Sequence, residues 1–141
     1  MSAQGDSRPA VLDASVALSW VIPDEGAGAA LDLRQIAIRE ATALAVPPTF
    51  WFEVANALWV SVRRERIASS GAHAALAALQ AFGVETLPCS VPACLAASEG
   101  TGLTVYDAAY IVVALDVSGV LWTVDIQMRH VAQAMGLQVL P

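Results

Sequence analysis

Short apolar runs alternate with longer helical patterns along most of the chain. The runs that predict strands lie at residues 10–12, 44–46, 84–87, 120–123 and 137–140. Between them, the spacing of apolar positions predicts helices over 14–22, 27–39, 50–66, 69–83, 91–98, 103–115 and 126–135. Such alternation is typical of a mostly parallel sheet with helices on its faces. The pattern therefore predicts an α/β fold, a three-layer sandwich with a central twisted sheet of four to five short strands.

The length of 141 residues suits one compact domain with a sizeable core. We expect residues 1–8 to form a flexible N-terminal tail before this domain. Asp6 and Arg8 precede the first apolar run, which is not the layout of a signal peptide. The longest uncharged run, 67–84, contains serines, glycines, a histidine and a glutamine, so it predicts a buried helix rather than a membrane span.

The amino-acid composition limits which binding partners and metal sites are expected. Apolar residues make up 57% of the chain, and the formal net charge is −6, with seven basic residues that are all arginine. This acidic balance counts against broad nonspecific nucleic-acid binding but leaves local phosphate contacts open. The only cysteines, Cys89 and Cys94, have no second pair that would complete a zinc site. We therefore expect two reduced thiols in a cytoplasmic protein.

Four carboxylates each stand as the only charged residue in an apolar stretch: Asp13, Glu53, Asp107 and Asp125. Burying an ionised carboxylate costs several kcal/mol unless a cation or hydrogen bonds compensate it. The other acids lie mostly in turns or on mixed polar faces, where solvation accounts for them. The four isolated carboxylates are therefore the candidate functional residues.

Each of the four also has a local explanation. Asp13 and Asp125 both end a strand and precede a helix, so either could be a helix cap. Thr104 and Asp107 have the spacing of a capping box. Glu53 lies four residues after Thr49, one position too far for that motif. Local capping therefore accounts for Glu53 least well.

Taken together, the four carboxylates predict a shared site. In open α/β sheets, ligands bind outside the carboxyl ends of the strands, where Asp13 and Asp125 fall. Glu53 and Asp107 lie near the starts of their helices and can face the same crevice. One carboxylate pair about 5 Å apart repels by roughly 3 kcal/mol at an effective dielectric of about 20. A hard divalent cation relieves that repulsion, and oxygen ligands suit Mg²⁺ or Mn²⁺.

Three uncharged polar residues accompany these acids. Asn56 lies one turn after Glu53 on the same helix face, where its amide could orient the carboxylate. Ser15 and Thr123 add hydroxyls close to Asp13 and Asp125 in sequence. Either hydroxyl could hold a carboxylate or a metal-bound water, or could instead cap a helix.

The stretches that carry these residues resemble the acidic motifs of PIN-domain proteins, and of VapC-type toxin ribonucleases in particular. They occur in the order Val11-Leu12-Asp13-Ala14-Ser15-Val16, Phe52-Glu53-Val54-Ala55-Asn56-Ala57-Leu58, Tyr106-Asp107-Ala108-Ala109-Tyr110 and Thr123-Val124-Asp125, and cover nearly the whole chain. The resemblance implies a PIN-like sandwich whose metal-binding acids are Asp13, Glu53, Asp107 and Asp125, supported by Ser15, Asn56 and Thr123. It also implies Mg²⁺- or Mn²⁺-dependent endonucleolytic cleavage of RNA, in a homodimer neutralised by a cognate antitoxin.

Basic residues are few, and the last motif departs from the family pattern by continuing as Ile126-Gln127-Met128-Arg129. Neither departure changes a proposed metal ligand. Both therefore concern the expected affinity for the RNA substrate rather than the proposed chemistry. Arg63, Arg64 and Arg66 form the one basic cluster, which could contact RNA phosphates or the antitoxin, or could serve the helix dipole and solubility. Arg129, four residues after Asp125, is expected to pair with it or to lie at the rim of the site.

Other protein classes fit less well. Phosphoacceptor receiver domains rely on a lysine, and haloacid-dehalogenase-like phosphatases use a basic residue that is typically lysine, but this chain has no lysine. The phosphatases also want an Asp-x-Asp motif, where Asp13 is followed by Ala14 and Ser15. The alternative that stays open is a catalytically weak or inert PIN-like module that acts through its partner surface.

Overall fold

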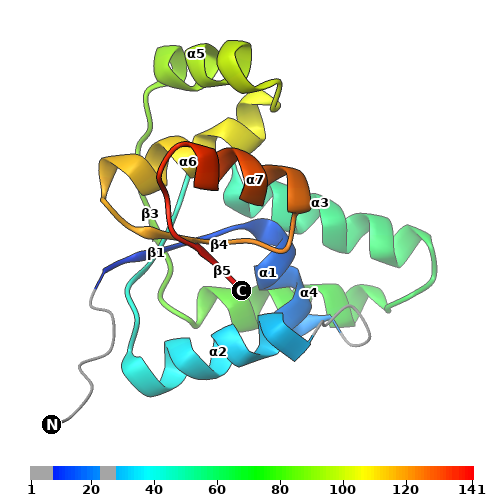
Figure 1. The fold of residues 1–141 in the computed structure, drawn as a ribbon. Helices are drawn as coiled ribbons and strands as arrows, with labels where there is room; N and C mark the ends of the chain where they lie inside the picture. The colour runs from blue at the N-terminus through cyan, green and yellow to red at the C-terminus, as the bar shows by residue number, and fades with distance from the viewer. Residues whose placement is uncertain (1–7, 23–27) are drawn as a thin grey trace, which may run out of the picture.

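The computed structural model describes residues 8–22 and 28–141 of the chain, and these form an α/β fold (Figure 1). In chain order its elements are β1 (Ala10–Leu12), α1 (Ala14–Val21), α2 (Gly28–Glu40), β2 (Leu44–Val46), α3 (Phe50–Arg63), α4 (Ser69–Gln80), β3 (Glu85–Thr86), α5 (Val91–Thr101), α6 (Val105–Asp116), β4 (Val120–Trp122), α7 (Ile126–Ala134) and β5 (Val139–Leu140). Every strand and helix predicted within these ranges is present. The predicted sandwich with a parallel sheet is therefore confirmed.

The five strands of the described residues form one parallel sheet in the order β3-β2-β1-β4-β5. The chain builds outward from β1 through β2 to β3, then returns to place β4 on the other side of β1. This reversal makes the gap between β1 and β4 the topological switch point, where open α/β sheets form ligand crevices. Leu12 pairs with Trp122 at the ends of these strands, so the residues that follow both strands emerge side by side.

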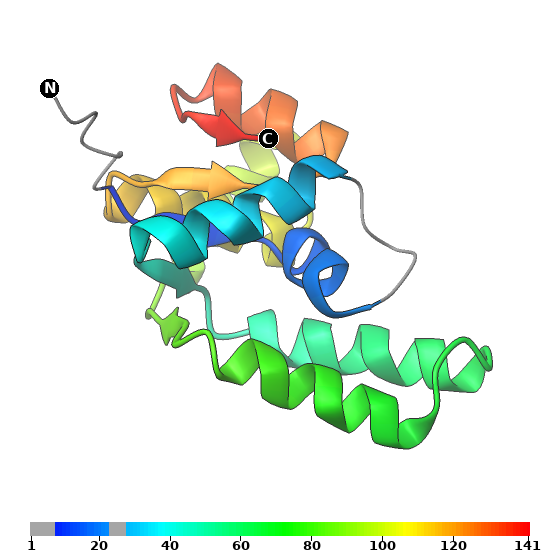
Figure 2. The same ribbon diagram turned by 90° about the horizontal axis from the view of Figure 1, so that it is seen from below.

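The strands at the centre of the sheet are buried over their whole length. Each residue of β1, β2 and β4 is buried, whereas β3 at the edge is exposed. A parallel sheet covered on both faces needs such continuous apolar strands, because neither face meets water. Helices α5, α6 and α7 lie on one side of the sheet, and α2 and α4 on the other (Figure 1). Seen from below, α3 and α4 run side by side as a helical hairpin (Figure 2).

Several predicted boundaries differ from the structure. The strand predicted at 84–87 contains only Glu85–Thr86, and the helix predicted at 91–98 continues to Thr101. That helix ends at Gly102, whose φ of 78° is the left-handed conformation that glycine adopts most easily. The helix predicted to reach residue 66 ends at Arg63. Helix ends depend on capping and packing that periodicity alone does not specify.

The predicted N-terminal tail falls largely outside the described residues, since 1–7 are not among them. Arg8, its last residue, donates a hydrogen bond to the side chain of Gln138. This contact connects Arg8 to the segment before β5, and the tail itself stays a prediction. Among the described helices, none is long and apolar enough to cross a membrane.

Gly119 sits where two backbones approach closely, and its replacement by alanine should destabilise the sheet. A Cβ atom built on Gly119 would lie 2.6 Å from the backbone oxygen of Pro9. That oxygen accepts the hydrogen bond from Val120 N at 2.9 Å that opens the β1–β4 ladder. Displacing it should cost about 1–3 kcal/mol of unfolding free energy, measured by urea titration.

Gly100 provides the matched control for this substitution. It lies inside α5, and an added Cβ would meet nothing within 4 Å. Gly100→Ala should therefore leave stability unchanged or raise it by up to about 1 kcal/mol, as alanine favours helix over glycine. Equal stability of the two variants would contradict the close approach at Gly119.

Candidate metal centre

Asp13 is the most deeply buried of the candidate acids and follows β1 directly. Its side chain is 5% exposed, and Oδ2 accepts hydrogen bonds from Ser15 Oγ at 2.7 Å and Thr123 Oγ1 at 2.8 Å. Thr123 follows β4 and is fully buried, so the pairing of β1 with β4 brings these two residues together. Asp13 occupies the N-cap position of α1 without a side-chain capping bond. The hydroxyls of Ser15 and Thr123 therefore hold the carboxylate, and the capping explanation of Asp13 is wrong.

Asp125 is connected to Asp13 through the same threonine. Its backbone N–H donates to Thr123 Oγ1 at 3.0 Å, while its own Oδ1 accepts a hydrogen bond from Met128 N at 2.8 Å. Asp125 therefore caps α7, and this local prediction is confirmed. Its side chain is exposed, unlike that of Asp13. The cap fixes the position of the carboxylate at the end of β4.

Glu53 lies in the first turn of α3 and is half-buried. Oε1 accepts a hydrogen bond from Thr49 Oγ1 at 3.3 Å, and Oε2 accepts one from the phenol of Tyr110 at 3.3 Å. Thr49 and Tyr110 therefore orient this carboxylate, while Asn56, the group expected to do so, is exposed and stays a predicted supporting residue. The tertiary contact between α3 and α6 thus decides how the Glu53 carboxylate is oriented.

Tyr110 is the functional residue that the sequence interpretation missed. It is fully buried in α6 and reaches Glu53 across 57 positions of sequence. One signal could have found it: Tyr110 lies three residues after Asp107, hence on the same face of the helix. Burial, followed by the nearby charges of Glu53 and Asp13, raises the pKa of the phenol. Tyr110 therefore stays protonated and donates its hydrogen bond.

Asp107 is half-buried in the first turn of α6. Its backbone N–H donates to Thr104 Oγ1 at 3.1 Å, which makes Thr104 the cap of this helix. The threonine half of the predicted capping box is confirmed. The Thr104 side chain also hydrogen-bonds the Asp107 carboxyl group, which opposes the rise of its pKa.

Mutual repulsion links the four carboxylates. Burial raises the pKa of Asp13; the hydroxyls that bind it oppose this shift, and the charge of Asp107 adds to it. The pKa of Glu53 is also raised. Burial is the largest cause, repulsion from Asp13 comes second, and repulsion from Asp107 is weaker. The pKa of Asp107 is raised by burial first and then by Asp125. The acids from β1, α3, α6 and the start of α7 thus form one electrostatic cluster.

The donor chemistry of this cluster fits a hard divalent cation, but its present geometry is open. Oxygen-only ligands with excess negative charge suit Mg²⁺ or Mn²⁺. Over the described ranges, however, no three acidic, histidine or cysteine side chains are close enough together to hold an ion. Glu53 and Asp107 are half-buried and Asp125 is exposed, so these three side chains are more accessible to solvent than Asp13. Asp13 is already fixed by its two hydroxyl partners.

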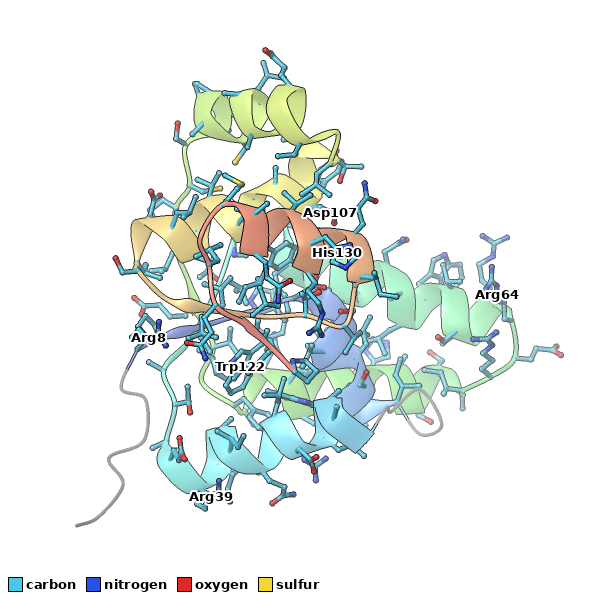
Figure 3. All side chains as sticks on the ribbon, viewed as in Figure 1. Arg8, Arg39, Arg64, Asp107, Trp122 and His130 are labelled. Carbon is cyan, nitrogen blue, oxygen red and sulfur yellow. The ribbon has the colours of Figure 1, made fainter. Side chains whose placement is uncertain are left out.

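The arginines lie outside this cluster. Arg63, at the end of α3, is ten residues from Glu53, or about 15 Å along a helix. Figure 3 shows Arg64 at the far end of α3, away from Asp107. The backbone N–H of Arg129 donates to the carbonyl oxygen of Asp125 at 3.0 Å, and the expected pairing of their side chains stays a prediction. Arg129 is half-buried on α7, one turn from Asp125.

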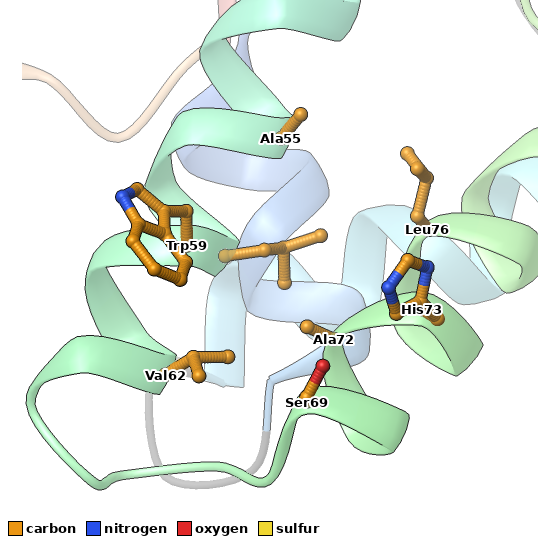
Figure 4. Close-up of a pocket in the computed structure, with 8 residues that line it drawn as sticks. Ala55, Trp59, Val62, Ser69, Ala72, His73 and Leu76 are labelled. Atoms are coloured by element: carbon orange, nitrogen blue, oxygen red, sulfur yellow. The ribbon is translucent and has the colours of Figure 1, made fainter.

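A separate apolar groove runs between α3 and α4 (Figure 4). It contains none of the candidate acids, and its lining residues are Ala55, Leu58, Trp59, Val62, Ser69, Ala72, His73 and Leu76. Trp59 lies on its rim with 57% of its surface exposed. An exposed tryptophan on an apolar groove is typical of a surface that binds another protein.

Comparison with solved structures identifies the fold. The chain is similar to the crystal structure of PAE2754 from Pyrobaculum aerophilum, with a TM-score of 0.74 and 22% identity over 98% of this chain and 88% of that chain. It is also similar to a chain in the crystal structure of VapBC2 from Rickettsia felis bound to a DNA fragment from their promoter, with a TM-score of 0.63 and 13% identity over 92% of this chain and 96% of that one. No family model and no curated protein matches the sequence. At these identities the likeness shows the fold, which is PIN-like.

Proposed function

We propose that this protein is a divalent-metal-dependent endoribonuclease, the toxin of a toxin–antitoxin pair acting in the cytoplasm. The observation that carries the proposal is the cluster of four mutually repelling carboxylates at the switch point of a PIN-like sheet. Such a cluster raises the free energy of the folded protein unless something compensates the charge. A bound Mg²⁺ or Mn²⁺ would supply that compensation, together with Lewis-acid activation of water and of the scissile phosphate.

The proposed ligands differ in how their carboxylates are held and in how deeply they are buried. Asp13 is held by two hydroxyls, so it would present a rigid ligand, with Ser15 and Thr123 as its positioning residues. Glu53 is oriented by Thr49 and Tyr110. Asp107 and Asp125 are less buried than Asp13, so they would be the more solvent-accessible ligands. Asn56 stays a predicted supporting group at the exposed edge of α3.

RNA and protein partners would use other surfaces. Arg63, Arg64 and Arg66 are exposed at the junction of α3 and α4, where they could bind RNA phosphates or antitoxin carboxylates. Arg129, one turn after Asp125 on α7, could neutralise a phosphate. The likeness to a chain of the VapBC2 complex supports an antitoxin partner. The apolar α3–α4 groove and exposed Trp59 supply area for that partner or for a homodimer.

One observation favours the alternative of an inert PIN-like module. As placed, no three candidate ligands of the described chain converge on a point that an ion could occupy. An inert module should bind Mn²⁺ no more tightly than its Asp13→Asn variant does. Calorimetric titration of both proteins with Mn²⁺ separates the two functions.

Expression in growing cells tests the nuclease directly. The unchanged protein should slow growth and create new RNA 5′ ends, whereas Asp107→Asn should do neither, because it removes a proposed metal ligand. Asp116→Asn is the matched control, since Asp116 is exposed at the other end of the same helix. It should behave as the unchanged protein does. Sequencing of RNA 5′ ends provides the measurement, and identical ends with and without Asp107 would contradict the proposal.

A further inference from the structure

The two cysteines form a close thiol pair away from the acidic cluster. Cys94 lies in α5 and is 2% exposed, and its thiol donates to the sulfur of Cys89 at 3.9 Å. Cys89 precedes the helix and is half-buried. A disulfide bond is about 2.05 Å long, so the two sulfurs need to approach by only about 2 Å.

The local backbone holds the two thiols in this arrangement. Ser90 caps α5 by accepting a hydrogen bond from Ala93 N at 3.2 Å, and its carbonyl oxygen accepts one from Cys94 N at 3.0 Å. These bonds fold the chain back so that Cys89, just outside the helix, meets Cys94, inside its first turns. The start of α5 therefore places the two thiols next to each other. A disulfide bond between them requires no unfolding of α5.

The sulfur of Cys94 also packs on α6. Cys94, Ala109 and Val112 form a small apolar cluster, with Cys89 and Ala97 against it. At about 100° per residue, Ala109 and Val112 lie on roughly the opposite face of α6 from Asp107 and Tyr110. The thiol pair therefore lies behind the helix that supplies one of the candidate acids.

We propose that Cys89 and Cys94 form a reversible dithiol–disulfide site that small-molecule disulfides oxidise. In the first step, the Cys89 thiolate attacks the small disulfide, forming a mixed disulfide and releasing one thiol. In the second step, the Cys94 thiolate attacks the sulfur of Cys89 and releases the second thiol. The two cysteines lose two electrons, and their two protons end on the released thiols, so one small disulfide is reduced for each bond formed.

Exposure decides which sulfur reacts first. Cys89 is the accessible member of the pair, whereas Cys94 is buried. Burial, then the neighbouring Cys89 thiol and the charge of Asp116, raise the pKa of Cys94 to about 11. Cys94 therefore acts as the resolving thiol, and the second step should be the slower one at neutral pH.

Incubation of the full native chain with oxidised glutathione tests this site. We expect a product lighter by two hydrogen atoms, with no attached glutathione, a Cys89–Cys94 link in the peptide map, and full reversal by dithiothreitol. Slower amide exchange should appear in the first turns of α5. A product that carries glutathione on Cys89 beside a free Cys94, or a link that forms only in denaturant, would overturn the proposal.

Two single variants keep the result interpretable. Cys94→Ala should trap the mixed disulfide, because glutathione on Cys89 then has no resolving thiol. Alanine suits the apolar cluster around that position, so this variant should fold. Cys89→Ala should leave Cys94 unmodified under native conditions because Cys94 is buried. Modification of Cys94 in that variant at the rate of the Cys89 reaction would exclude the proposed order.

Discussion

Replacing Asp13 with asparagine should lower Mn²⁺-dependent RNA cleavage by more than about 100-fold while preserving the fold. Changes to groups that merely support a metal ligand typically cost 10–100-fold, and a change to the ligand itself should exceed that. The asparagine side-chain oxygen can still accept hydrogen bonds from Ser15 and Thr123. The substitution also removes a buried charge, so stability should not fall. The measurements are the cleavage rate of a labelled RNA pool and the urea midpoint of each protein.

Asp32→Asn is the control for this prediction. Asp32 is exposed on α2, outside the acidic cluster, and its replacement changes net charge equally. This variant should cleave at the unchanged rate. Full activity of Asp13→Asn, or activity of the unchanged protein in EDTA, would remove the case for a metal-dependent nuclease built on Asp13.

Addition of Mn²⁺ should stabilise the folded protein markedly at neutral pH. An ion that binds only the folded state contributes about 2.7 kcal/mol when its free concentration is 100 times the dissociation constant. Part of this gain comes from relief of repulsion among Asp13, Glu53 and Asp107. The unfolding free energy, measured by urea titration with and without Mn²⁺, should therefore differ for the unchanged protein and much less for Asp13→Asn.

The pH dependence without added metal should run against the usual acid lability of proteins. The pKa values of Asp13, Glu53 and Asp107 are raised above their ordinary 3.8 to 4.5, so the folded state binds more protons than the unfolded state in that range and above. Stability contributed by these groups is therefore fully present below their ordinary pKa values and is lost as pH rises through the folded pKa values. Mn²⁺ should stabilise most where that loss is complete. A stability that rises with pH above these ordinary pKa values, in the absence of metal, would contradict this assignment.

Sequence identified the candidate acids because they are isolated, but it did not determine which neighbouring side chains bind them. Burial of a lone carboxylate is energetically costly, so Asp13 and Asp107 stand out without any knowledge of the fold. Ser15 and Thr123 had two open roles, capping or holding a carboxylate, and local sequence favoured neither. Their contacts with Asp13 decide between these roles. Tyr110 escaped notice because an aromatic residue in an apolar helix is usually part of the core.

The sequence by itself determined the order of helices and strands, because hydrophobic periodicity depends only on near neighbours along the chain. It also determined which carboxylates stand alone among apolar residues. Only the tertiary structure decided that β4 returns beside β1, since parallel strands are joined by long crossovers whose destination no local signal specifies. That choice places Thr123 against Asp13, 110 positions away, and brings Tyr110 to Glu53. The sequence alone thus singles out the individual acids, whereas the fold brings them together into one cluster.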